Sequence, residues 1–101
     1  MPAVPGLRRG LSALYGERLK GVYVFGSRAR TDAAMDSDLD VLVVLDRIDS
    51  YAEELERTSA LTAGLSLALG FTVSRVFAAE ADWETAKSPF LAGVRADAVS
   101  A

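Results

Sequence analysis

The segment of residues 38–45 constrains the fold of this chain most strongly, because an acidic start runs directly into an uninterrupted apolar run. Residues 41–45 consist only of valine and leucine, and β-branched valine favours strands. A strand that is apolar on both faces is typical of the centre of a sheet that helices cover on both sides. The sequence therefore predicts an α/β domain with this segment as a central strand.

Two elements are expected before the central strand. Apolar residues recur at helical spacing from residue 7, which predicts an amphipathic helix over residues 7–20. Residues 22–25 are β-branched or aromatic, and Gly26 and Ser27 follow them, which predicts a buried strand that ends in a tight turn. The next residues are polar or small, and we expect a short helix over residues 28–34.

A long helix and a third strand are expected after the central strand. Ser50 opens the capping pattern Ser-x-x-Glu, and Gly70 is placed to end the helix that follows. The apolar stripe expected to face the core consists of Tyr51, Leu55, Leu61, Leu65 and Leu69. Residues 71–77 follow as the predicted third strand. Because a helix connects the two strands, they are expected to be parallel, with a right-handed crossover.

The C-terminal segment predicts short helices and an interface. Asp82 is expected to cap a short helix that extends to residue 87, and the pair Ser88-Pro89 is expected to open another. Four apolar side chains of this segment predict an exposed patch that another subunit covers: Trp83, Phe90, Leu91 and Val94. For Trp83, packing within the chain is the plainer interpretation. We therefore expect a homo- or hetero-oligomer.

The composition excludes several kinds of chemistry and partner. The 101 residues include no Cys and no His, which excludes thiol nucleophiles, disulfides, structural zinc and an imidazole base. Eleven basic and fourteen acidic residues argue against an extended nucleic-acid partner. A membrane helix needs about twenty apolar residues, and no run approaches that length. We expect one domain, residues 1–101, with no membrane partner and, without a signal-peptide core, a cytoplasmic location.

Acidic residues are concentrated at the start of the central strand. Asp32, Asp36, Asp38 and Asp40 lie within nine positions. Asp38 and Asp40 are two apart, so their side chains point to the same face of a strand and can hold one or two hard divalent ions. A solvated acidic loop is the plainer interpretation. A calcium-binding EF-hand loop does not fit, because its sixth position would be Val41 instead of glycine.

The spacing of the Gly-Ser turn and the paired acids indicates a family. Gly26-Ser27 is followed, after residues 28–37, by Asp38-Leu39-Asp40, which leads into the apolar strand. This pattern resembles the signature of the nucleotidyltransferases of the DNA polymerase beta superfamily. Residues 21–30 and 36–43 look like their smallest members, the minimal nucleotidyltransferases, which are commonly paired with a HEPN-domain protein as a toxin–antitoxin module. The resemblance implies a nucleotidyltransferase fold, with a small mixed sheet flanked by helices.

The resemblance also implies a site and an activity. Asp38 and Asp40 would be the catalytic ligands of Mg²⁺ (or Mn²⁺). The nucleotide-binding residues would be Gly26, Ser27, Arg28 and Arg30, with a nucleoside triphosphate, most simply ATP, as the substrate. The implied function is that of an antitoxin that transfers AMP to a hydroxyl of a HEPN-domain partner.

One departure from the family pattern leaves a second function open. The family's third carboxylate lies on the third strand, where alignment places Ser74, and a hydroxyl replaces a carboxylate poorly as a metal ligand or a base. The nearest later acids are Glu80 and Asp82. The alternative function is a catalytically impaired antitoxin module that acts by binding its partner directly. A third function is transfer to a small-molecule hydroxyl. It is less expected, because we expect a single domain and therefore no second domain to hold the acceptor.

Overall fold

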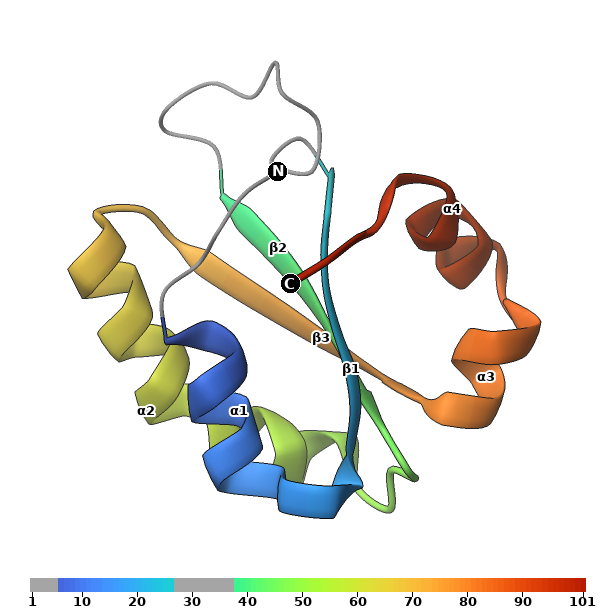
Figure 1. Cartoon of the computed structure of the whole chain (residues 1–101), viewed down its shortest axis with the longest axis horizontal. Helices are drawn as coiled ribbons and strands as arrows, with labels where there is room; N and C mark the ends of the chain where they lie inside the picture. Colours follow the sequence, from blue (N-terminus) through green and yellow to red (C-terminus); the bar gives the residue numbers. More distant parts are fainter. Residues whose placement is uncertain (1–5, 27–37) are drawn as a thin grey trace.

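The computed structural model describes residues 6–26 and 38–101, which form a mixed sheet flanked by helices (Figure 1). The elements in chain order are α1 (Leu7–Tyr15), the 3₁₀ turn η1 (Gly16–Arg18), β1 (Leu19–Phe25), β2 (Leu39–Leu45), α2 (Tyr51–Leu69), β3 (Val73–Ala79), α3 (Glu80–Thr85), α4 (Pro89–Asp97) and β4 (Val99–Ser100). The strand order is β3-β2-β1-β4. β2 and β3 are parallel, and β1 is antiparallel to both β2 and β4. The expected α/β class and strand directions are confirmed.

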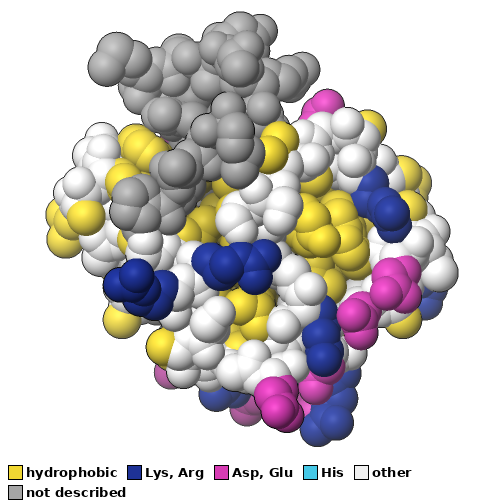
Figure 2. Space-filling view, viewed as in Figure 1, with side chains coloured by type: hydrophobic (Ala, Val, Ile, Leu, Met, Phe, Trp, Pro, Cys, Tyr) yellow, Lys and Arg dark blue, Asp and Glu magenta, His cyan; other side chains and the backbone are white. Residues whose placement is uncertain are grey.

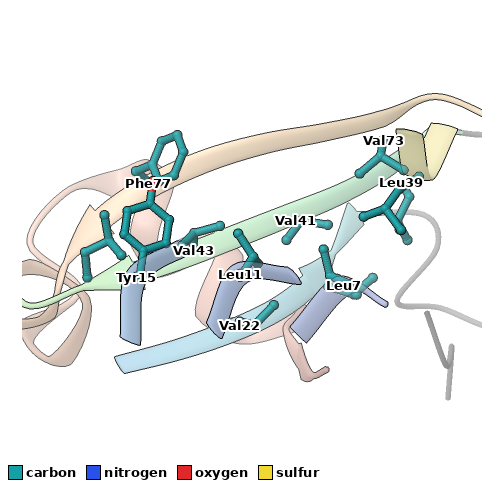
Figure 3. Packing of buried hydrophobic residues seen from close by; sticks show 12 residues of the cluster. Leu7, Leu11, Tyr15, Val22, Leu39, Val41, Val43, Val73 and Phe77 are labelled. Atoms are coloured by element: carbon teal, nitrogen blue, oxygen red, sulfur yellow. The ribbon is translucent and has the colours of Figure 1, made fainter. Parts of the chain in front are cut away.

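β2 is the central strand because both of its faces are buried. Its odd-numbered residues pack in one cluster with α1 and α2, and Leu42 and Val44 pack in a second cluster with α3 and α4. Figure 3 shows Leu7 and Leu11 of α1 beside Val41, within the first cluster. All five residues of the apolar run are at most 1% exposed. The two clusters explain why this segment contains no polar residue after Asp40.

α2 has the expected ends, and its inner face includes polar residues beside the expected leucines. Ser50 Oγ accepts a hydrogen bond from the backbone N–H of Glu53 at 3.3 Å, and Gly70 ends the helix in the left-handed conformation. Leu65 is buried in the core, and Leu55, Leu61 and Leu69 are partly buried against it, which confirms the leucine stripe; Tyr51 is 42% exposed. The same face also buries Glu54, Thr58 and Thr62, which the sequence pattern did not predict.

Glu54 is the best example of a satisfied buried polar group. It is 3% exposed and accepts hydrogen bonds from Tyr15 Oη at 2.8 Å, Arg57 Nε at 3.1 Å and Arg18 Nη2 at 3.2 Å. Burial alone would raise the pKa of Glu54, but these donors and the charge of Arg18 lower it below its ordinary value. The carboxylate thereby ties α1 and the η1 turn to α2.

Two helix boundaries differ from the sequence prediction. α1 ends at Tyr15 rather than near residue 20, because Gly16 leaves the helical region at φ 56° and Leu19 already pairs with Leu45 in the sheet. α3 begins at Glu80 directly after β3, so Asp82 lies inside the helix and does not cap it. The helix expected over residues 28–34 lies outside the described residues.

The predicted start of α4 is confirmed, and a fourth strand follows it. Ser88 Oγ accepts a hydrogen bond from the N–H of Leu91 at 3.1 Å, and proline occupies the first turn. The short strand β4 then pairs with β1, where Val99 lies opposite Val24.

α2 also covers the outer edge of β3. The N–H of Val73 donates to Ser66 Oγ at 2.9 Å, and the N–H of Phe77 donates to Tyr51 Oη at 3.1 Å. Between them, Arg75 Nε donates to Thr58 Oγ1 at 2.9 Å. Side chains of α2 therefore take the place that a further strand would occupy.

The surface differs from the expected interface patch. Trp83, Leu91 and Val94 are buried within the chain, and of the four patch residues only Phe90 is exposed, at 54%. The predicted patch is wrong, because α3 and α4 turn three of these side chains onto the sheet; the oligomer stays a prediction.

On the face seen in Figure 2, Lys and Arg side chains are dispersed rather than gathered in a stripe. Within the described ranges, the longest apolar helix falls short of a membrane-crossing segment.

Candidate functional site

The paired acids lie at one end of the sheet, beside the end of β1. Asp40 is directly opposite Phe25 on β1 and Ser74 on β3. Directly paired residues of neighbouring strands project to the same face of a sheet, and this face is the one that α3 and α4 cover further along. Asp38 precedes β2 with the same parity and is exposed. The site is therefore an acidic cluster on the α3–α4 face.

Gly26 forms the second wall of the site. Its φ is 74°, and a Cβ atom at this position would lie 2.6 Å from Asp40 Oδ2. A contact that short does not occur, so a side chain at residue 26 would push the carboxylate away. The backbone turn after β1 and the carboxylate of β2 thus form one continuous surface. Ser27, Arg28 and Arg30, predicted to extend this surface, lie outside the described residues.

The electrostatics of Asp40 are those of a crowded carboxylate. Burial raises its pKa, and the negative charge of Asp38 raises it further. A cation placed between two such carboxylates relieves both effects. The donor set also fits a hard divalent ion such as Mg²⁺, because Asp38, Asp40 and the hydroxyl of Ser74 offer only oxygen atoms.

Ser74, which the family pattern predicts at the position of the third carboxylate, lies opposite Asp40 on β3. It faces the same side of the sheet as Asp40 and is half-buried. In the described ranges, no cluster of three or more potential metal-binding side chains forms. Ser74 was singled out from the sequence, and the register pairs it with Asp40; its role at the site stays a prediction.

The later acids lie at the other end of β3. Ala79 pairs with Leu45, whereas Ser74 pairs with Asp40, so Glu80 begins α3 at the end of the sheet away from the site. Six strand residues of about 3.3 Å each separate Glu80 from Ser74 by roughly 20 Å. Asp82 is held instead by Lys87, at 3.7 Å. Neither acid joins the paired aspartates.

A hollow beside the site was missed by sequence reasoning. It measures about 340 Å³ and is lined by Phe25 and Gly26 on the β1 side and by Phe90, Gly93, Val94 and Asp97 on α4. Figure 1 shows α4 at the same end of the molecule as the end of β1. The sequence held one signal for it, a glycine inside a helix, where glycine is unfavourable.

Comparison with known proteins agrees with this arrangement. The family model described as "Nucleotidyltransferase domain" matches residues 4–90. The chain therefore belongs to the nucleotidyltransferase domain family, which supports nucleotidyl transfer as its general reaction class.

A solved structure narrows the class to the minimal nucleotidyltransferases, as the sequence pattern predicted. The chain is similar to a structure named as a candidate minimal nucleotidyltransferase, with 30% sequence identity and a TM-score of 0.55. The match covers 90% of this chain and 82% of that chain. No curated protein matches the chain.

Proposed function

We propose that this protein binds a nucleoside triphosphate together with Mg²⁺ and transfers the nucleoside monophosphate to a hydroxyl group. The observation that carries the proposal is the close approach of Gly26 to Asp40, where a Cβ atom at residue 26 would displace the carboxylate. A bare backbone turn lets phosphate oxygens approach closely, and a carboxylate pair beside it offers ligands for the metal that accompanies them. The site thus combines a phosphate-binding turn with a metal-binding pair.

Each residue of the site has a role in this proposal. Asp38 and Asp40 hold the metal, and Gly26 gives the triphosphate access to them. When bound, the metal neutralises negative charge that develops on the departing pyrophosphate. Ser27, Arg28 and Arg30 stay predictions from the family pattern, as donors to the phosphates.

The reaction exchanges one bond to phosphorus for another. The acceptor oxygen bonds to the α-phosphorus, and the bond from that phosphorus to the oxygen bridging to the β-phosphate breaks. Pyrophosphate leaves with the electron pair, and the hydroxyl proton passes to a base. Because Ser74 is a poor base near neutral pH, solvent takes this proton, and the transfer is slow. The nucleotide, ATP, and the acceptor, a HEPN-domain partner, rest on the family pattern.

The hydroxyl of Ser74, in the place where the family pattern has a carboxylate, favours a second candidate function. With a hydroxyl opposite Asp40 and Glu80 at the far end of β3, the site has the metal pair but not the third acid. A chain of this kind can bind nucleotide and neutralise its partner by direct contact without transferring anything. The two functions share the nucleotide site and differ in whether labelled AMP reaches another molecule.

Calorimetric titration with Mg²⁺ and ATP tests the shared site. Replacing both acids (Asp38→Asn with Asp40→Asn) is expected to abolish binding, because the metal loses both charged ligands. The matched control is Asp49→Asn, an exposed acid whose carboxylate pairs with Arg47 at 3.4 Å beyond the other end of β2. Equal affinity in the double variant and the parent would overturn the proposal. Transfer from ATP labelled at the α-phosphate then separates the two functions.

A further inference from the structure

We propose that the hollow between β1 and α4 binds the base of the nucleotide, and that Asp97 selects bases with an exocyclic amine. This inference rests on the proposed function, since the phosphates of the same nucleotide lie at Gly26. The chemical class it names is adenine, guanine and cytosine nucleotides, as distinct from uracil nucleotides. The residues concerned are Phe90, Gly93 and Asp97 of α4.

The hollow is continuous with the phosphate end of the site. Gly26 lines the hollow and also lies against the carboxylate of Asp40. A nucleotide whose phosphates contact Gly26 therefore meets the hollow as the next surface. No part of the described chain has to move to connect them.

Two aromatic rings form walls on which a base can stack. Phe25 and Phe90 meet edge to face, with ring centroids 6.1 Å apart and planes at 85°. Phe90 is 54% exposed, so its ring is open to a ligand. Any nucleobase can stack on such a ring, because every base has an aromatic face.

Gly93 keeps the hollow open. It lies inside α4, where glycine destabilises a helix relative to alanine. Packing does not require it, because a Cβ atom at residue 93 would meet no described atom within 4 Å. Because Gly93 lines the hollow, a larger side chain at this position would enter the space in front of the helix.

Asp97 has a position that favours a role in binding. It is the last residue of α4, where the helix dipole makes a carboxylate unfavourable. Arg95, the nearest basic residue on the helix, does not pair with Asp97 but donates to the carbonyl oxygens of Trp83 and Glu84, at 2.7 and 2.8 Å. Within the described part of the chain, Asp97 forms no ion pair. Its carboxylate can accept hydrogen bonds from an amine but repels the carbonyl oxygen that uracil presents instead.

Filling the hollow tests its occupant. Gly93→Leu is expected to weaken the binding of ATP, in the presence of Mg²⁺, at least tenfold, and to leave the binding of inorganic tripolyphosphate unchanged. Gly64→Leu on α2 is the matched control, because Gly64 is also a helical glycine with nothing within 4 Å of its Cβ position. It should change neither affinity. Phe90→Ala, at an exposed position, provides a second variant with the same expected pattern.

The selection by Asp97 is tested by the ratio of the affinities for ATP and UTP. The parent is expected to bind ATP about tenfold more tightly than UTP, and Asp97→Ala should reduce this ratio to about one. The loss of a negative charge affects both triphosphates alike, so the ratio isolates the base. An unchanged ATP affinity in Gly93→Leu and Phe90→Ala, or equal affinities of the parent for ATP and UTP, would overturn this inference alone. A parent that binds neither ATP nor tripolyphosphate would overturn the proposed function as well.

Discussion

The close approach of Gly26 to Asp40 predicts an unusual stability cost for one added methyl group. In Gly26→Ala the new Cβ atom would lie 2.6 Å from Asp40 Oδ2, so the carboxylate must turn away. Alanine in the left-handed region costs about 1–2 kcal/mol, and moving a side chain off its preferred rotamer costs about 0.5–1.5 kcal/mol more. We expect the free energy of unfolding to fall by about 2–3 kcal/mol.

A second glycine separates the two contributions. Gly70 is in the left-handed region at φ 80°, and nothing lies within 4 Å of its Cβ position, so Gly70→Ala should cost only the backbone contribution, about 1–2 kcal/mol. Urea unfolding of the parent and both variants measures the difference. In an Asp40→Ala background, Gly26→Ala should cost no more than Gly70→Ala.

The same variants test the link from geometry to binding. Gly26→Ala should weaken the binding of ATP with Mg²⁺ at least tenfold, because the displaced carboxylate no longer faces the metal. Gly70→Ala should bind as the parent does, since Gly70 ends α2, which packs on the other face of the sheet. Equal stability losses at the two glycines, with nucleotide binding intact in both variants, would refute the close approach and the site built on it.

Three further predictions concern the acids and the hydroxyl opposite them. Ser74→Asp should raise the rate of AMP transfer at least about tenfold, measured with labelled ATP, while Glu80→Gln leaves the rate unchanged. Asp40→Asn should raise the free energy of unfolding at pH 7, because burial and Asp38 raise the pKa of Asp40 and disfavour its charge; the gain should disappear in urea unfolding below its ordinary pKa of 3.8. Glu54→Gln should lower stability by about 3 kcal/mol at pH 7. Since the pKa of Glu54 is lowered, its contribution is present above the ordinary value of 4.5 and is lost as the pH falls, so the variant should lose less stability between pH 5 and pH 2 than the parent.

The elements with local signals could be predicted from the sequence. Ser50 and Gly70 end a helix through contacts within a few residues, and Ser88 begins another in the same way. The apolar run after Asp40 identified the central strand, because only a strand buried on both faces tolerates it. Ser74, which alignment with the family pattern singled out, pairs with Asp40 in the parallel register.

Features that depend on distant partners could not be predicted in this way. Glu54 is buried because Tyr15, 39 residues earlier, donates to it, and no periodicity contains that information. The approach of Gly26 to Asp40 arises between strands, and the hollow on α4 arises between a strand and a helix. β4 is two residues long, too short for any alternating pattern.

The covering of β3 by α2 has a consequence for how variants of this protein behave in cells. Ser66 and Tyr51 occupy the outward N–H groups of β3 at Val73 and Phe77, which would otherwise be open to a strand from another molecule. Substitutions at Ser66 or Tyr51 leave the paired aspartates on β2 unchanged but remove the partner of an outward N–H group on β3. Such substitutions should lower the yield of soluble protein and leave the activity of each folded molecule unchanged. Screens that count only surviving activity would therefore mark these two positions as functional, although they contribute solubility and no chemistry.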